Sequence, residues 1–251
     1  MLKSLFHLFY PRQCNCCSTS LDQFEKMICT QCRHDIPLTR FHHFNDPTLK
    51  KVFYGRLQLE QATALFFFEK KGPVQKLLHH LKYKGQEGLS NFLGDWLGHE
   101  LSSIALYKTI DVVIPVPIHP KKLKHRGYNQ VTGFGKMLSQ HLKAEFDEKT
   151  LIKSKNTATQ VFKGRFTRSD EILNAFSITD RMALAGKHIL LVDDIVTTGA
   201  TLEACALELL KIPKIKLSIA TMAITTEVFR SFHNNCVCAR IRKILTQLLL
   251  L

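Results

Sequence analysis

The sequence lacks any long apolar run. The longest apolar runs, such as residues 65–68 and 248–251, fall far short of the roughly 18 residues that a membrane-spanning helix needs. The first residues form a brief apolar patch that His7 and Pro11 interrupt, and no small-residue cleavage site follows it. Internal repeats and low-complexity tracts are also missing. These absences predict a chain without stable membrane insertion that works in the cytoplasm.

Negative charge is scarce. The chain has 21 Asp and Glu against 35 Lys and Arg, which leaves a net charge of +14, and no acid occurs between residues 112 and 144. Such a balance indicates a polyanionic partner, whether nucleic acid, a phosphorylated metabolite or an anionic surface. A length of 251 residues, 45% of them hydrophobic, suits one domain with an appendage or two small domains.

Strand and helix patterns alternate through the middle of the chain. Apolar runs predict strands, and amphipathic periodicity with Pro73 near a first turn predicts helices. The expected strands are 61–68, 111–117, about 150–154, 187–194 and 215–224, and the expected helices are 72–83, 89–106, 127–142 and 200–211. This alternation predicts an α/β fold with a doubly wound parallel sheet.

Five of the eight cysteines crowd the N-terminus. Two C-x-x-C knuckles, Cys14 with Cys17 and Cys29 with Cys32, can place four thiolates around one metal, which is the structural zinc arrangement. Cys16 offers a second but poorer register. Unrelated free thiols and a redox-active or iron–sulfur site are the alternatives. Three further cysteines are expected to be free: Cys205, Cys236 and Cys238.

Two adjacent acids, Asp193 and Asp194, end the apolar run of "ILLVDDIVTTGAT". They could be solvated acids at an ordinary turn. A magnesium-binding receiver domain is a second possibility, but it needs a longer segment after Asp194 than this chain has. No Lys follows in the Walker pattern. The stretch instead resembles the PRPP (phosphoribosyl pyrophosphate) motif of type I phosphoribosyltransferases.

That resemblance gives each residue a chemical role. The strand delivers the acids to the carboxyl edge of the sheet, where open α/β folds bind ligands, and the carboxylates accept hydrogen bonds from ribose hydroxyls. A helix N-terminus with hydroxyls and backbone N–H groups forms an anion site for the 5′-phosphate. Its residues are Thr197, Thr198, Gly199, Ala200 and Thr201.

A basic loop is expected to form the other half of this site. "VVIPVPIHPKKLKHRGYNQV" (112–131) reads as a strand, a Pro-bounded loop and a cluster of Lys and Arg. Arg126 has a planar, multi-donor side chain suited to pyrophosphate, and Asn129 could add a donor. For Lys121, Lys122 and Lys124, a solvated charge run is an equally good interpretation.

Five motifs in this order resemble the ComF/GntX family of phosphoribosyltransferase-like proteins. They are the double C-x-x-C start, "LKYKG" (81–85), "PVP" (115–117), "RGYNQ" (126–130) and "VDDIVTTGAT" (192–201). The resemblance spans about residues 10–225. One departure is "RSDEILNAF" (168–176), where Glu171 stands at a position at which the family tends to have Asn.

The resemblance implies a zinc-binding N-terminal module and a type I phosphoribosyltransferase-like parallel sheet with helices on both faces. It also implies Mg2+ bound with PRPP. Competence members of the family handle incoming single-stranded DNA during natural transformation, which suggests competence or recombination proteins as partners; other members are tied to gluconate use. The expected division is a zinc module at 1–45, a phosphoribosyltransferase-like domain at 46–228 and a tail at 229–251.

Three acid-free basic stretches, 70–84, 119–130 and 153–168, favour single-stranded DNA as the polyanion. Basic groups can follow a phosphate backbone while nearby aromatics stack on bases. The alternative divides these residues among pyrophosphate binding, core packing and solubility. The expected pyrophosphate or DNA contacts are Lys82, Lys84, Lys121, Lys124, Arg126, Asn129, Arg165 and Arg168. The function is therefore expected to be DNA handling, with an active phosphoribosyltransferase or a PRPP sensor as alternatives.

Overall fold

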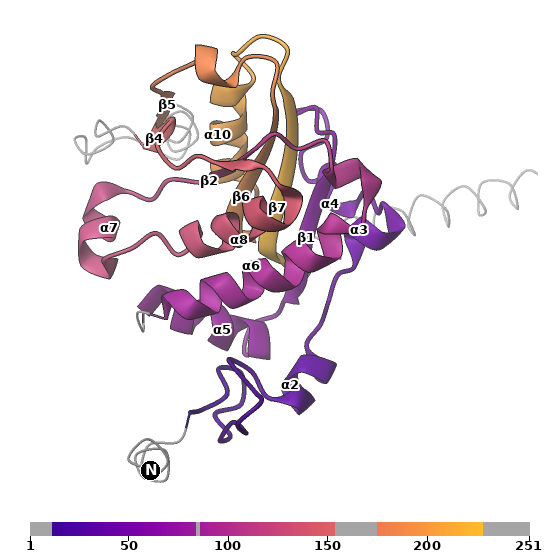
Figure 1. The fold of residues 1–251 in the computed structure, drawn as a ribbon, viewed down its shortest axis with the longest axis vertical. Helices are drawn as coiled ribbons and strands as arrows, with labels where there is room; N and C mark the ends of the chain where they lie inside the picture. The colour runs from indigo at the N-terminus through magenta and orange to yellow at the C-terminus, as the bar shows by residue number, and fades with distance from the viewer. Residues whose placement is uncertain (1–11, 84–85, 154–174, 228–251) are drawn as a thin grey trace, which may run out of the picture.

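A five-stranded parallel sheet forms the centre of the molecule (Figure 1). The structure, a computed structural model, describes residues 12–83, 86–153 and 175–227. The strand order is β1-β7-β6-β2-β3, and every pairing in this sheet is parallel. The strands are β1 (Ala62–Phe68), β2 (Val112–Pro115), β3 (Glu145–Phe146), β6 (His188–Val196) and β7 (Lys216–Thr225).

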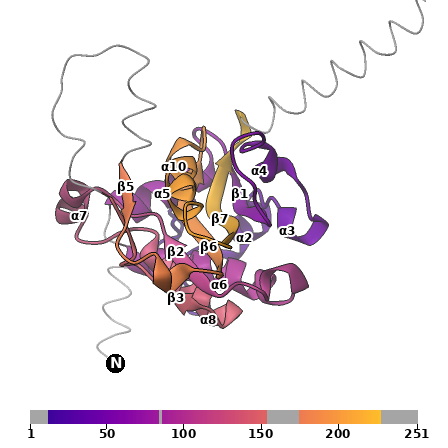
Figure 2. The same cartoon turned by 90° about the horizontal axis from the view of Figure 1, so that it is seen from above.

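Helices cover both faces of this sheet, as the sequence predicts (Figures 1 and 2). Side chains alternate along each strand: Val113, Leu190 and Val192 pack on one side, while Ile114 and Leu191 pack on the other. The first side carries α5 (Pro73–Tyr83), α6 (Glu87–Ser102) and α8 (Thr132–Leu142). The second carries α3 (Phe41–Phe44), α4 (Thr48–Lys51) and α10 (Ala200–Leu209).

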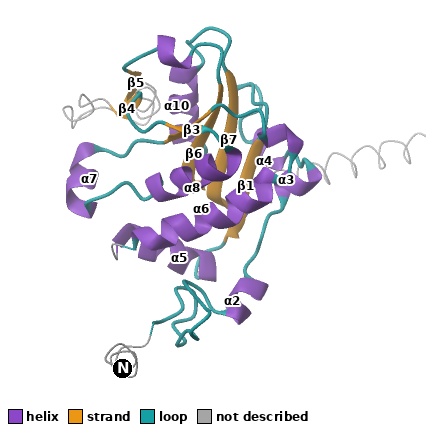
Figure 3. Ribbon diagram, in the orientation of Figure 1, coloured by secondary structure: helices purple, strands orange, loops and turns teal. Residues whose placement is uncertain are grey.

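Smaller elements complete the described fold (Figure 3). An antiparallel pair stands apart from the main sheet and consists of β4 (Leu151–Lys153) and β5 (Phe176–Ile178). The 3-10 helices are η1 (Ala105–Tyr107) and η2 (Met182–Leu184), and the remaining short helices are α2 (Thr30–Asp35) and α7 (Pro120–Arg126). No helix in the three described ranges is both long and apolar enough to cross a membrane.

The expected helix over 127–142 is wrong at its beginning. A separate helix, α7, ends at Arg126, Gly127 takes the left-handed conformation at φ 81°, and α8 begins only at Thr132. Glycine permits this backbone reversal without a Cβ clash. Residues 127–131 thus form a turn, and this turn carries most of the "RGYNQ" motif.

The cysteine-rich segment lies against α5 and α6, below the sheet in the view of Figure 1. Asn15 is hydrogen-bonded to His80 of α5 at 2.9 Å, and the guanidinium of Arg33 lies 4.8 Å from the ring centre of Trp96 of α6. The buried side chain of Ile28 adds to the core beneath α5 and α6. The segment therefore shares its apolar contacts with the α/β core.

Candidate functional site

The two acids of the "VDD" stretch lie on β6 near its carboxyl end, and both are buried. Because neighbouring residues of a strand face opposite ways, the two side chains meet different partners. Asp194 faces the α5 side of the sheet, where Lys82 lies, and the charge of Lys153 acts on Asp193. The structure thus brings the two acids to one sheet edge, where Lys82 pairs with Asp194 and the charges of both Lys82 and Lys153 act on Asp193.

Asp194 is the centre of a chain of polar contacts. Its Oδ2 lies 2.7 Å from Nζ of Lys82, and it accepts a hydrogen bond of 3.1 Å from Nε2 of Gln130. The guanidinium of Arg126 in turn donates to Oε1 of Gln130 at 2.7 Å. Three motifs that are separate in the sequence, "LKYKG", "RGYNQ" and "VDD", therefore meet at one carboxylate.

Asp193 is in a setting that favours its neutral form. Burial, followed by the adjacent charge of Asp194, raises the pKa of Asp193 to about 8, although its contact with the Asp194 N–H and the charges of Lys82 and Lys153 oppose the rise. At neutral pH Asp193 is therefore mostly protonated, and Lys82 lies beside Asp194. A protonated carboxyl can donate a hydrogen bond as well as accept one.

The loop after β6 forms a small anion-sized hollow. A cavity of about 40 Å³ is lined by Asp193, Ile195, Thr197, Thr198, Gly199, Ala200, Thr201 and Leu202. Gly199 has φ 81° and is the N-cap of α10, so the first N–H groups of that helix border the hollow. Thr197, Thr198 and Thr201 are exposed. All five predicted loop residues thus line one cavity.

Phe53 covers this loop from α4's side. A Cβ placed on Gly199 would lie 2.7 Å from a ring carbon of Phe53, which is fully buried. Contacts this short do not occur between real side chains. Gly199 is therefore required both for its positive φ and for the close approach of Phe53.

The 127–131 turn is held on three sides. Asn129 donates from Nδ2 to the carbonyl of Val116 at 3.0 Å, and the Tyr128 hydroxyl donates to the carbonyl of Leu81. Ser90 of α6 donates to the carbonyl of Gln130 at 2.6 Å. Asn129 and Tyr128 thus fix the turn to the residue after β2 and to α5, and this holds Gln130 against Asp194.

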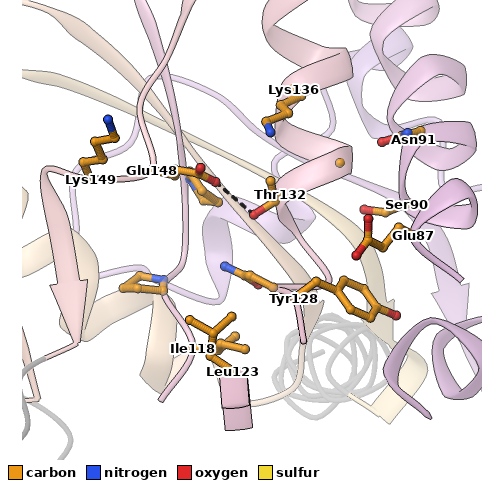
Figure 4. Close-up of a pocket in the computed structure, with 14 residues that line it drawn as sticks. Glu87, Ser90, Asn91, Ile118, Leu123, Tyr128, Thr132, Lys136, Glu148 and Lys149 are labelled. Atoms are coloured by element: carbon orange, nitrogen blue, oxygen red, sulfur yellow. Dashed lines mark hydrogen bonds between the residues drawn. The ribbon is translucent and has the colours of Figure 1, made fainter. Parts of the chain in front are cut away.

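The same turn borders a much larger cavity of about 590 Å³ (Figure 4). Tyr128 and Asn129 line it together with residues from α6, α8 and the segment after β3. Thr132 donates to Glu148 at 3.2 Å, and Figure 4 shows Lys149 near Glu148 and Lys136 near Thr132. Its remaining lining residues are Glu87, Ser90, Asn91, Pro115, Pro117, Ile118, Leu123 and Gly133. The volume suits a small molecule.

The predicted basic residues are not all in one place. Lys82 lies against Asp194 and Arg126 is half-buried beside Gln130, whereas Lys121 and Lys124 are exposed on α7. Figure 1 shows α7 standing away from the sheet. The positions of Lys84, Arg165 and Arg168 lie outside the described residues, as do Cys236, Cys238 and the expected tail.

Three residues of this region were not among the predicted site residues: Gln130, Lys153 and Phe53. Gln130 is the last residue of the "RGYNQ" motif and directly follows the predicted site residue Asn129, so the motif could have indicated it. Lys153 lies in a basic stretch, and burial lowers its pKa. Nothing in the sequence near Phe53 pointed to Gly199, because the two lie far apart along the chain.

The four predicted metal ligands come together. The sulfurs of Cys14, Cys17, Cys29 and Cys32 all lie within 4.8 Å of one another. Backbone N–H groups donate to two of these sulfurs: those of Cys16 and Cys29 to Cys14, at 3.4 and 3.3 Å, and that of Cys32 to Cys29 at 3.4 Å. Such donors stabilise thiolates, so the cluster could hold a metal.

Comparison with known proteins gives one domain family and several relatives. The phosphoribosyl transferase domain family matches residues 132–227. DNA utilization protein YhgH of Escherichia coli (strain K12) is 27% identical over 201 residues, which cover 79% of this chain and 84% of that protein. Competence protein F of Haemophilus influenzae is 28% identical over 134 residues, which cover 52% of this chain and 58% of that protein.

Among solved structures, adenine phosphoribosyltransferase from Saccharomyces cerevisiae is similar over 56% of this chain and 71% of its own, at 20% identity and a TM-score of 0.37. The assignment of the fold rests on the parallel sheet topology and the domain match. The domain match and the two relatives confirm the expected resemblance to phosphoribosyltransferase-like competence proteins.

Proposed function

Because the chain is a homologue of DNA utilization protein YhgH and Competence protein F and contains a phosphoribosyl transferase domain, we propose that it binds PRPP with Mg2+ and handles incoming single-stranded DNA during natural transformation. The observation that supports PRPP binding is the placement of Asp193 and Asp194 beside the Gly199 loop. The two carboxyl groups suit ribose hydroxyls, and the loop suits a phosphate.

The proposed division of labour follows from the contacts. The loop of Thr197, Thr198 and Gly199 receives the 5′-phosphate through hydroxyls and N–H groups. Asp193 and Asp194 bind the ribose hydroxyls, and Arg126, already oriented by Gln130, contributes charge on the pyrophosphate side. Mg2+ is bound mainly by the pyrophosphate, as the ion prefers phosphate oxygens together with one or two carboxylates.

Titration calorimetry with PRPP and Mg2+ tests this site. The Asp193→Asn, Asp194→Asn double variant keeps the size of both side chains but removes their ability to ionise, and we expect it to lose most of its PRPP affinity. Asp95→Asn, which changes an exposed acid of α6, is the matched control and should bind as the parent does. Equal PRPP affinity in the double variant would refute the site.

DNA binding is supported by the basic surface at α7. Its cluster of Lys121, Lys122 and Lys124 is exposed and follows β2 at the carboxyl edge of the sheet. Phosphate contacts release counterions, so affinity should fall steeply with salt. In this proposal the pyrophosphate-side residues and the DNA-contacting residues share one edge of the molecule.

Fluorescence anisotropy with a labelled single-stranded oligonucleotide tests this contact. Lys121→Ala, Lys124→Ala should weaken binding and reduce the slope of log affinity against log salt by about 0.7 per lysine. Lys214→Ala, Lys216→Ala alters as many exposed charges near the amino end of β7 and should leave the slope unchanged. No binding by the parent at low salt would exclude direct contact with DNA.

Turnover is the second candidate function, and the phosphoribosyl transferase domain match favours it. In that case the site would stabilise the charge that develops as pyrophosphate leaves. Incubation with PRPP, Mg2+ and a panel of bases should then release pyrophosphate. If no base in the panel leads to pyrophosphate release while PRPP still binds, turnover on those bases is excluded and only the proposal of PRPP binding remains.

We propose further that Cys14, Cys17, Cys29 and Cys32 hold a structural zinc ion. Four thiolates without an open position suit zinc, and the segment that carries them shares its core contacts with α5 and α6. The ion would organise the proposed module of residues 1–45, apart from a phosphoribosyltransferase-like domain of residues 46–228. Elemental analysis should find zinc in the parent and less of it in a Cys17→Ser variant.

A further inference from the structure

Two histidines and a glutamate converge where α3 meets α6, away from both sites described above. Nε2 of His42 lies 2.7 Å from Oε2 of Glu100, and Nε2 of His43 lies 3.7 Å from the same oxygen. The candidate ligand atoms of all three side chains lie within 4.8 Å of one another. The two imidazole rings are close neighbours, with centres 4.4 Å apart.

Neighbouring residues hold the outer polar atoms of His42 and Glu100. Nδ1 of His42 shares a hydrogen bond of 2.9 Å with the hydroxyl of Thr63 on β1. The indole N–H of Trp96 donates to Oε1 of Glu100 at 2.9 Å. This leaves Nε2 of His42 and Oε2 of Glu100, which share a hydrogen bond of 2.7 Å, as the atoms that an ion would bind in place of that bond.

We propose that His42, His43 and Glu100 form a binding site for a divalent transition-metal ion of the zinc class. Two imidazoles and one carboxylate are a ligand set that zinc and its neighbours bind, and a fourth position is then left for water. Metal-ligating histidines and carboxylates are usually held by outer hydrogen bonds, as Thr63 and Trp96 hold these.

Access to the ion comes from the side of His43. The side chain of His43 is 41% exposed, that of Glu100 is 20% exposed and that of His42 is 1% exposed. An ion would therefore meet His43 first and be anchored by the two more buried ligands. Because His42 and His43 lie on α3 and Glu100 lies on α6, the ion would join these helices.

The nitrogen and oxygen ligands distinguish this site from the four-cysteine cluster. A hydrogen bond between His42 and Glu100 would explain the 2.7 Å distance without an ion, so the decisive quantity is the amount of metal bound. The full-length protein is dialysed against a buffer with a fixed concentration of free Zn2+, and zinc per chain is measured by elemental analysis. The parent should contain one more zinc ion per chain than His43→Ala, and one more than Glu100→Gln.

His99→Ala is the matched control, because His99 is an exposed histidine next to Glu100 on α6. His99→Ala should bind as much zinc as the parent. Zn2+ should raise the Tm of the parent and of His99→Ala by the same amount, and should raise the Tm of His43→Ala by less, because that variant loses the ion that joins α3 to α6. The difference between parent and His43→Ala does not depend on how the cysteines behave. Equal zinc content in the parent and His43→Ala would overturn the proposal.

Discussion

The two adjacent acids of β6 differ in their surroundings and therefore in their chemistry. Asp194 has Lys82 at 2.7 Å and accepts a hydrogen bond from Gln130. Burial, and after it the neighbouring Asp194, raises the pKa of Asp193 to about 8. A basic protein thus accommodates two buried acids because one is paired with a lysine and the other keeps its proton over much of the neutral range.

We expect Asp193 to make the folding stability fall as pH rises from about 4 to about 8. The folded chain keeps a proton there that the unfolded chain, with a carboxyl pKa near 3.8, releases. Asp193→Asn cannot ionise and should lack this fall. Urea unfolding should show the variant gaining on the parent by up to about 1.4 kcal/mol per pH unit. Parallel profiles of the two proteins would contradict the raised pKa.

Gly199 should tolerate alanine far less well than another glycine with the same kind of backbone. Gly199 and Gly186 have φ of 81° and 73°, but only Gly199 has Phe53 in the way of a Cβ. Both substitutions cost about 1 kcal/mol for the backbone, and Gly199→Ala adds about 1–3 kcal/mol for the clash. Urea unfolding of Gly199→Ala and Gly186→Ala checks the difference, and equal losses would show that Phe53 yields freely.

At the scale of the elements, strands with apolar runs were predictable, and so was the short strand β4, whereas β3 and α7 were not. β6 and β7 lie within a residue or two of their expected bounds, because buried parallel strands read as apolar runs. β3 has only two residues, too few for any periodicity. α7 has Pro120 at its start and Gly127 after its end, but its basic surface has no apolar stripe, so it read as a loop.

The residues of the loop in the candidate site could be predicted from the sequence, whereas the site's contacts between residues far apart in the chain could not. The acids and the threonines are consecutive, so one strand and one turn suffice to bring them together. The contact of Gln130 with Asp194 and that of Phe53 with Gly199 depend on how α8 and α4 pack on the sheet. Periodicity indicates which face of an element is buried, but it does not indicate which residue lies opposite.

α6 and α8 both line the larger cavity, and their close packing depends on Gly94. A Cβ on Gly94 would lie 2.6 Å from the backbone oxygen of Phe134, whereas one on Gly98 would meet the side chain of His141. A side chain can rotate away and a backbone cannot. We therefore expect Gly94→Ala to destabilise the protein by about 1–3 kcal/mol and Gly98→Ala by clearly less. Urea unfolding of both variants measures this, and a reversed order would contradict it.

At the scale of the whole molecule, the cysteine-rich segment and the α/β core are joined through α6. Trp96 takes part in contacts to both: Arg33 of the cysteine-rich segment lies over its ring, and the centre of the Phe66 ring of β1 lies 5.6 Å from its own. Since the segment shares its core with α5 and α6, a metal in the cysteine cluster would stabilise this joint as well as the segment itself.

Removal of that metal should therefore be visible at Trp96, the single tryptophan of the chain. A chelator should loosen the segment, move Arg33 off the ring and shift the emission of Trp96 to longer wavelength. The experiment is best done in the His43→Ala variant, so that only the four-cysteine site can lose a metal. The control is Arg33→Ala in the same variant, whose Trp96 emission should already lie at longer wavelength before the chelator is added. Unchanged emission after zinc has been shown to leave would mean that the segment stays docked on its apolar contacts alone.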